Sequence, residues 1–248
     1  DILVLHCDFV TLQSPLKPKV PYTKDPAEQL SRLREASYSL LTEAFPKAEV
    51  DNEGAKSISL EGGSLTRKID VVPSNWYDTV KYRETNEKCY RGVMILDYKS
   101  KKCIGNTPFY HNKLLADKDA KTFNNYKKII RLLKTLKADA KKELDIDIKL
   151  SSYDIAALMY HMENSKYLVG SSPLSLIENS LTFMRKVYIN ASLRNGLKVP
   201  DESRNIFEDG RATEGDLLLL IQQVERVYEE IINYLKKSGS TIQKKFVV

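Results

Sequence analysis

The chain has 248 residues, of which 42% are hydrophobic and 29% charged, and it carries a net charge of +6. It is therefore long enough to bury one large core or two smaller ones, and its charge is compatible with a polyphosphate or nucleic-acid partner without requiring one. No apolar run is long enough to cross a membrane, and three widely spaced cysteines favour reduced thiols in a cytoplasmic protein over a disulfide framework.

The first half of the chain is predicted to form a small sheet with one helix. Residues 1–5 are predicted to form a strand, in which Asp1 is followed by four apolar residues, and since a domain rarely opens on such a strand, we expect the chain to be truncated upstream. Asp25 and Pro26 have the pattern of an N-cap followed by a first-turn proline, which predicts a helix that ends at Pro46. Residues 98–115 are expected to be loop. The further predicted strands, the first two joined by a Gly-Gly turn, are residues 56–60, 68–72 and 92–97.

The second half of the chain has the apolar spacing of helices. One helix is predicted from residue 120 onward, and another is capped by Ser151 and Ser152. Strands followed by helices indicate an α+β fold class. We expect a lobe with a small mixed or antiparallel sheet, residues 1–115, followed by a helical lobe, residues 116–248.

A single carboxylate, Asp70, lies inside the β-branched run KIDVVPSNW. A strand of this kind is buried on at least one face, and a buried carboxylate without a partner is costly. Alternation along the strand lets Asp70 face a cleft, where phosphoryl transfer with two divalent cations needs about three converging carboxylates. Asp1 begins a second strand of the same kind. The alternative for Asp70 is a strand-edge carboxylate that pairs with a lysine such as Lys56 or Lys68.

The order of the motifs along most of the chain gives a family resemblance. A strand that begins with Asp and a helix that ends in a proline precede the paired strands KSISL and KIDVVPSNW, and the helical segments IIRLLKTLKAD and LSSYDIAALMYHM follow. This order resembles the polymerase-β-type nucleotidyltransferase superfamily, and within it the bacterial cGAS/DncV-like nucleotidyltransferases. Asp70 matches the third aspartate of that family, and Asp1 matches the second aspartate of its Asp-x-Asp pair. The family's Gly-Ser turn and first aspartate are absent, so we expect them upstream unless the chain is an inactive relative.

The resemblance implies a magnesium-dependent enzyme with its active site in the cleft between two lobes. It would transfer a nucleotidyl group from a nucleoside triphosphate to a ribose hydroxyl, release pyrophosphate and make a cyclic di- or trinucleotide signal for antiphage defence. Asp1 and Asp70 are implied as catalytic residues and as ligands of two Mg²⁺ ions, or of Mn²⁺ in their place. Two other functions stay open, namely nucleotidyl transfer to a protein or tRNA and a non-catalytic scaffold of the same fold.

The resemblance also implies a nucleotide-binding role for residues of the helical lobe. Lys134, Ser151 and Ser152 would contact the triphosphate, because a helix N-terminus with free hydroxyls favours phosphate. The ring of Tyr153 would stack on the base. The alternatives are a plain N-cap for Ser152 and a core aromatic residue for Tyr153.

The expected partners follow from these assignments. Nucleoside triphosphates are the expected substrates, with a regulatory protein as a further candidate partner and no membrane. Lys127, Arg131 and Lys134 form a basic stripe along one helix face. The stripe is a candidate contact for nucleic acid, although a solvated helix face is the ordinary explanation of such a pattern.

Overall fold

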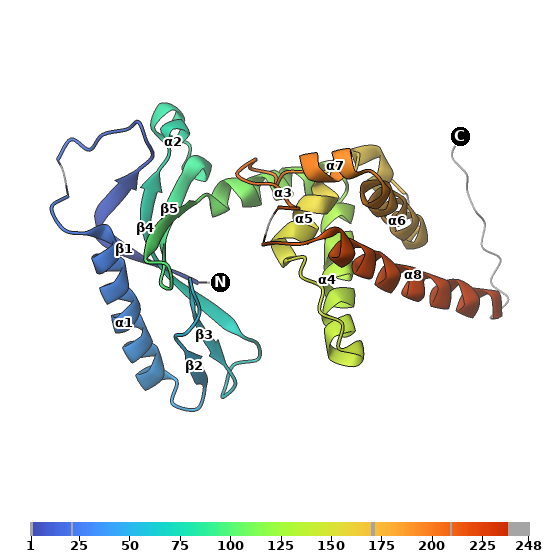
Figure 1. The fold of residues 1–248 in the computed structure, drawn as a ribbon, viewed down its shortest axis with the longest axis horizontal. Helices are drawn as coiled ribbons and strands as arrows, with labels where there is room; N and C mark the ends of the chain where they lie inside the picture. The colour runs from blue at the N-terminus through green and yellow to red at the C-terminus, as the bar shows by residue number, and fades with distance from the viewer. Residues whose placement is uncertain (1, 21, 170–171, 209, 238–248) are drawn as a thin grey trace. The chain divides into compact units, whose positions relative to one another are not determined.

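The computed structural model describes residues 2–20, 22–169, 172–208 and 210–237. The chain divides into two compact units, Asp1–Lys113 and Leu114–Val248, which are called the sheet unit and the helical unit below (Figure 1). No helix within the described ranges is long and apolar enough to cross a membrane.

The sheet unit is built around one long strand, β4. This strand pairs in parallel with β1 and antiparallel with β3 and β5, while β2 and β6 pair antiparallel with β3 and β5 respectively. The sheet is therefore mixed. Its six strands are β1 (Ile2–Leu12), β2 (Glu49–Asp51), β3 (Ile58–Glu61), β4 (Ile69–Asp78), β5 (Arg91–Asp97) and β6 (Lys102–Asn106).

One face of this sheet is covered by helix α1 (Pro26–Ala44) (Figure 1). The Asp25 side chain accepts a hydrogen bond from the backbone N–H of Ala27, so the predicted N-cap is confirmed. Leu30 of α1 is fully buried with side chains of β1 and β5, and Leu41 packs farther along, where β3 and β4 contribute their apolar residues. A short helix, α2 (Val80–Thr85), and a 3₁₀ turn, η1 (Lys88–Tyr90), connect β4 to β5.

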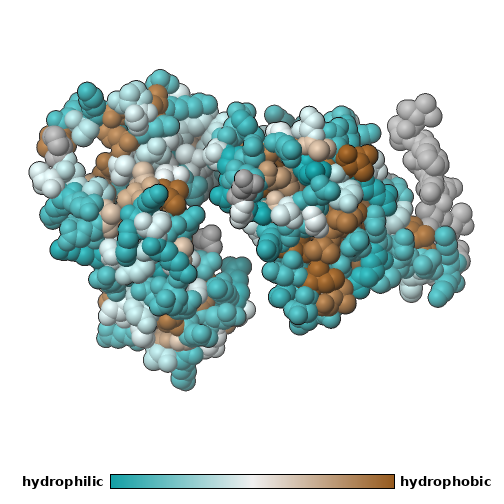
Figure 2. All heavy atoms as spheres, in the orientation of Figure 1, coloured by the Kyte–Doolittle hydropathy of each residue, from teal (hydrophilic) through white to brown (hydrophobic). Residues whose placement is uncertain are grey.

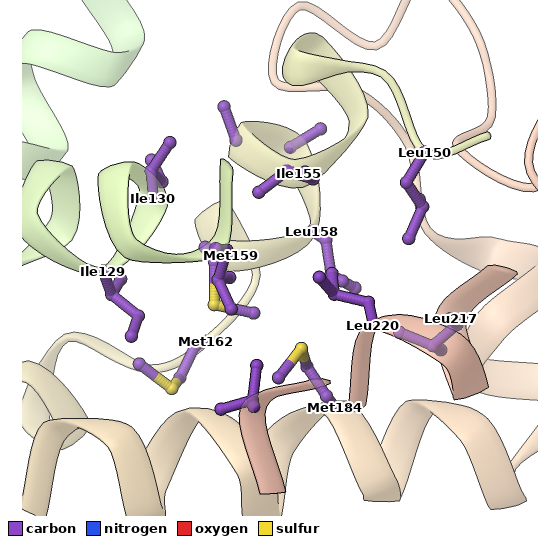
Figure 3. Close-up of a cluster of buried hydrophobic side chains, with 14 of the residues drawn as sticks. Ile129, Ile130, Leu150, Ile155, Leu158, Met159, Met162, Met184, Leu217 and Leu220 are labelled. Atoms are coloured by element: carbon purple, nitrogen blue, oxygen red, sulfur yellow. The ribbon is translucent and has the colours of Figure 1, made fainter. Parts of the chain in front are cut away.

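The helical unit has a core of its own. Figure 3 shows Ile129 of α4, Met159 of α5, Met184 of α6 and Leu220 of α8 converging on that core. All four side chains are fully buried or nearly so. The helices, the first of which begins in the sheet unit, are α3 (Pro108–Lys121), α4 (Asn125–Leu144), α5 (Ser152–Tyr160), α6 (Pro173–Ile189), α7 (Ala191–Gly196) and α8 (Glu214–Lys237), with a 3₁₀ turn η2 (Asn164–Tyr167).

The α+β prediction is confirmed, together with the antiparallel pair β3–β4. The expectation that residues 98–115 form a loop is wrong, because the segment contains β6 and the beginning of α3. Strand β6 is exposed along its whole length, and it becomes a strand only by pairing with β5. Such an edge strand carries no alternation of apolar and polar residues that a sequence could reveal.

Candidate active site

Asp70 is the second residue of β4 and is partly exposed. Its Cα lies opposite that of Ser59 on β3. The next residue, Val71, is buried with Ile58 in the cluster that packs against α1. Because neighbouring residues of a strand point to opposite faces, Asp70 lies on the face of the sheet away from α1.

The carboxylate of Asp70 has no hydrogen bond or ion pair with any residue of the described ranges. Lys56, one of the two lysines proposed as partners of Asp70, interacts with Asp97. The pKa of Asp97 is lowered, first by a hydrogen bond from the backbone N–H of Ser100 and also by the charge of Lys56. The alternative for Asp70, an ion pair with Lys56 or Lys68, is therefore not present within the described ranges.

Asp1, the other predicted metal ligand, lies outside the described residues. Among those that are described, no group of three or more His, Cys, Asp or Glu side chains could hold a metal ion. Asp70 fits one position of such a site, because its partly exposed carboxylate has no partner among the described residues, and hard cations such as Mg²⁺ prefer oxygen ligands. The described residues alone do not supply all the carboxylate ligands that such a metal site needs.

The N-terminus of α5 brings three predicted residues together. Ser151 is the N-cap, and its hydroxyl accepts a bond from the N–H of Asp154 at 3.1 Å and donates to Oδ2 of Asp154 at 2.6 Å. The N–H of Ser151 donates to the same oxygen at 3.1 Å, which completes a capping box. Ser152 is the first helical residue and is exposed, so the capping role falls to Ser151 and not to Ser152.

Tyr153 is half-buried and packs against the helical core. Its hydroxyl lies 3.5 Å from Oδ2 of Asp201, and the guanidinium carbon of Arg204 lies 5.2 Å from the centre of its ring. Burial, followed by the charge of Asp201, raises the pKa of the Tyr153 hydroxyl, so the residue stays neutral at physiological pH. The ring therefore packs partly as a core aromatic residue would, and it also keeps an exposed part, as stacking on a base would require.

Lys134 lies on α4 and is half-buried, and burial lowers the pKa of its amine. In the part of the chain that the structure describes, it forms no hydrogen bond to Ser151 or Ser152. Lys137, one turn farther along, makes the direct contact to this region, with its amine 2.7 Å from the carbonyl oxygen of Leu150. In the basic stripe Lys127 is exposed, and its amine lies 3.5 Å from the Asp119 carboxylate.

The candidate residues fall into two groups. Asp70 belongs to the sheet unit, and Lys134 and the α5 residues belong to the helical unit. The predicted cleft that would join them stays a prediction.

Sequence reasoning missed Arg204, which forms an ion pair with the buried Asp154 at 2.6 Å. These residues are 50 positions apart, so no local spacing connects them.

The helical unit also has a small cavity between α4 and α6. Its volume is about 290 Å³, and its floor is apolar, with Ile129, Leu132 and Leu176 among the lining residues. None of the predicted nucleotide-binding residues lines it. On the face shown in Figure 2, hydrophilic side chains cover most of both units, with the largest apolar area on the helical unit and smaller ones on the sheet unit.

Comparison with known proteins finds a family model that matches the helical half. The model describes the cGAS/DncV-like nucleotidyltransferase C-terminal helical domain, and it matches residues 113–236. The cyclic dinucleotide synthase CdnE of Yersinia aleksiciae is 39% identical over 213 residues, which cover 86% of this chain and 56% of that protein. The c-di-GMP synthase of Capnocytophaga granulosa is 32% identical over 183 residues, which cover 73% of this chain and 51% of that protein. The chain thus spans about half the length of these curated relatives.

A solved structure of a similar synthase also resembles this chain. The STING-associated CdnE c-di-GMP synthase from Capnocytophaga granulosa matches with a TM-score of 0.68 at 28% identity. The match covers 84% of this chain and 65% of that one. It includes more of the chain than the helical domain alone.

Proposed function

The chain belongs to the cGAS/DncV-like nucleotidyltransferase family, and on that premise we propose that it transfers a nucleotidyl group from a nucleoside triphosphate to a ribose hydroxyl. The observation that carries the proposal is the placement of Asp70 in the sheet unit. This carboxylate is partly exposed, lies on the sheet face away from α1 and has no partner among the described residues. A carboxylate left without a partner on an ordered strand is available to a cation.

In this proposal Asp1 and Asp70 supply carboxylate ligands for two Mg²⁺ ions. The parallel register of β1 and β4 supports the pairing, because Ile2 lies opposite Val71 and Leu3 opposite Val72. The described beginning of β1 therefore lies beside the end of β4 that carries Asp70. Bound Mg²⁺ would lower the pKa of the attacking hydroxyl and offset the charge on the phosphates. Asp70 itself would orient that hydroxyl and accept its hydrogen bond.

The helical unit would bind the nucleotide. The first N–H groups of α5 and the exposed hydroxyl of Ser152 would face the triphosphate, and Lys134 would add a positive charge. Ser151 would act through the cap, because its hydroxyl is already bonded to Asp154. The ring of Tyr153 would stack on the base.

A cyclic dinucleotide is the product that we propose, by analogy with the names of the relatives. The Yersinia protein is called a cyclic dinucleotide synthase, and the Capnocytophaga protein is called a c-di-GMP synthase. A signal of this kind fits the antiphage role that the family resemblance implies, with a regulatory protein as the activating partner. The basic stripe on α4 would be the place for a nucleic-acid contact.

Product analysis tests the proposal directly. The purified protein is incubated with ATP, GTP, CTP and UTP in Mg²⁺, and the products are identified by liquid chromatography and mass spectrometry. We expect a cyclic dinucleotide that resists phosphatase, together with released pyrophosphate. Labelled nucleotide found instead on a protein or tRNA would replace this function with the transfer alternative.

A further inference from the structure

We propose that Arg204 is a positioning residue of the nucleotide site, which holds Tyr153 and the N-terminus of α5 in the arrangement that binds the triphosphate. The inference rests on the proposed function and gives the segment around Arg204 a role within it. Arg204 would not touch the reacting atoms. It would set nucleotide affinity through the two features of α5 that it contacts.

The first contact is with Asp154, whose carboxylate is buried. Asp154 is 3% exposed, and an ionised carboxylate in such a place is costly unless it is paired. Arg204 donates to Oδ1 at 2.6 Å, while Oδ2 accepts from the N–H and the hydroxyl of Ser151. Both oxygens are therefore engaged, one by the cap of α5 and the other by Arg204.

This pair controls the electrostatic field at the beginning of a nine-residue helix. A helix N-terminus attracts anions through its unpaired N–H groups. An uncompensated Asp154 in the first turn would oppose that attraction and repel a triphosphate. Because Arg204 neutralises Asp154, the helix keeps its capping box and its affinity for phosphate together.

The second contact is with the ring of Tyr153. The guanidinium carbon of Arg204 lies 5.2 Å from the ring centre, a distance at which a cation is attracted to an aromatic face. The Tyr153 hydroxyl meets Asp201 from the same segment. Arg204 and Asp201 therefore fix the orientation of the ring that a base would meet.

The segment that carries Arg204 is itself anchored. Arg204 donates to the carbonyl oxygen of Asn205 at 2.9 Å, and Asn205 forms a β-bridge with Lys198. A ring nitrogen of His161, at the other end of α5, lies 2.6 Å from the carbonyl oxygen of Lys198. The segment thus contacts α5 at its C-cap and at its N-terminus, so Arg204 belongs to a segment that is anchored at both ends of the helix.

Nucleotide binding by variants tests this inference without requiring turnover. Dissociation constants of ATP and GTP with Mg²⁺ are measured by calorimetry for the wild-type protein, Arg204→Met, Arg204→Lys, Tyr153→Ala and the Arg204→Met/Tyr153→Ala double variant. Arg194→Met is the matched control, since Arg194 is a buried arginine of the same unit that bonds to Glu214 and the carbonyl oxygen of Tyr188, whereas Arg204 is partly exposed. Thermal unfolding is recorded for each variant.

We expect Arg204→Met to raise the dissociation constants about tenfold and Arg204→Lys to raise them less, because lysine keeps the charge but not the planar fork. In the Tyr153→Ala background the effect should fall to about threefold, because part of it acts through the ring. Arg194→Met should lower thermal stability and leave the dissociation constants unchanged. If Arg204→Met does not fold, the dissociation constants of Arg204→Lys decide.

Two results would overturn the inference alone, provided that the wild-type protein binds nucleotide. One is unchanged affinity in a folded Arg204 variant, and the other is full additivity with Tyr153→Ala. If the wild-type protein binds no nucleotide, the proposed function and the role of Arg204 fall together.

Discussion

Asp70 and Asp78 lie eight positions apart on β4, so strand alternation puts them on the same face of the sheet. Asp78 is buried and pairs with Arg83 at 3.1 Å and with Arg91 at 2.8 Å, and Arg91 in turn lies over the ring of Trp76. Asp78 therefore stabilises the fold. Asp70 is more exposed and has no such partner among the described residues. Surroundings, and not residue type, separate a structural carboxylate from a candidate ligand.

Replacing Asp70 by Asn is expected to lower turnover by at least about a hundredfold, because one negative metal ligand is lost. The free energy of unfolding should stay within about 0.5 kcal/mol of the wild-type value, since no described partner is broken. Nucleotide binding should persist. Product yield is measured by chromatography and stability by urea unfolding. Glu61→Gln, an exposed carboxylate on β3, is the control, and wild-type yield from Asp70→Asn would refute the catalytic assignment.

Replacing Tyr153 by Ala should raise KM more than it lowers kcat, because a stacking contact is worth on the order of 1–3 kcal/mol per base. Stability should also fall, since the ring packs on the helical core. Tyr188→Ala removes another half-buried ring from the same core and separates the two effects. Initial rates over a range of ATP and GTP concentrations give KM. A KM shift of the same size in both variants would reduce Tyr153 to a packing residue.

At the scale of whole elements, predictability follows how local the signal is. Helix α1 was predicted from its capping residues, because a cap is encoded by neighbours in sequence. Helix α3 was missed in part because it buries polar side chains, Lys118 and Asp119 among them, which weakens the apolar spacing. For the candidate site, a local motif predicts Asp70, whereas the pair of Asp154 and Arg204 depends on tertiary folding and has no local signal in the sequence.

Lys118 lies in the part of α3 that belongs to the helical unit, and its amine makes an unusual set of contacts there. Its amine donates to the carbonyl oxygen of Met162 at 2.8 Å and to Oδ1 of Asn164 at 3.0 Å. Three tyrosine rings lie near it, those of Tyr126, Tyr160 and Tyr167. Burial, with a smaller contribution from the charge of Lys121, lowers the pKa of Lys118 to about 8.

This lowered pKa predicts a stability change with pH. An unfolded lysine titrates near pH 10.4, so between about pH 8 and 10.4 the unfolded chain binds more protons than the folded one. Folding at this site therefore becomes more favourable as pH rises through that window. Lys118→Met lacks the titration, so the free energy of unfolding of the wild-type protein relative to Lys118→Met should rise by about 1–3 kcal/mol from pH 7 to pH 10.

Urea unfolding at both pH values measures this difference. Lys142→Met is the control, because Lys142 is an exposed lysine on α4 that does not contribute to the lowered pKa of Lys118, and its substitution should leave the difference constant with pH. The lowered pKa would be contradicted if the free energy of unfolding of the wild-type protein relative to Lys118→Met stayed constant or fell between pH 7 and pH 10.

For the whole molecule, the described core residues form separate clusters. The large cluster takes all its buried side chains from the helical unit, and the two smaller ones take theirs from the sheet unit. Apolar burial is the main stabilising contribution to folding, so each unit has its own source of stability. The two units are therefore expected to unfold separately.

Core truncations in each unit test this expectation. Leu158→Ala removes a fully buried side chain of the helical core, labelled in Figure 3, and should cost about 2–5 kcal/mol in that unit. Hydrogen exchange followed by mass spectrometry should show faster exchange in α4 and α6, with protection of β4 and β5 unchanged. Leu60→Ala, from the core beside α1, should give the reverse pattern. If either substitution lowered protection in both units equally, the cores would form one cooperative block, and nucleotide affinity measured in helical-unit variants would then also report on the sheet.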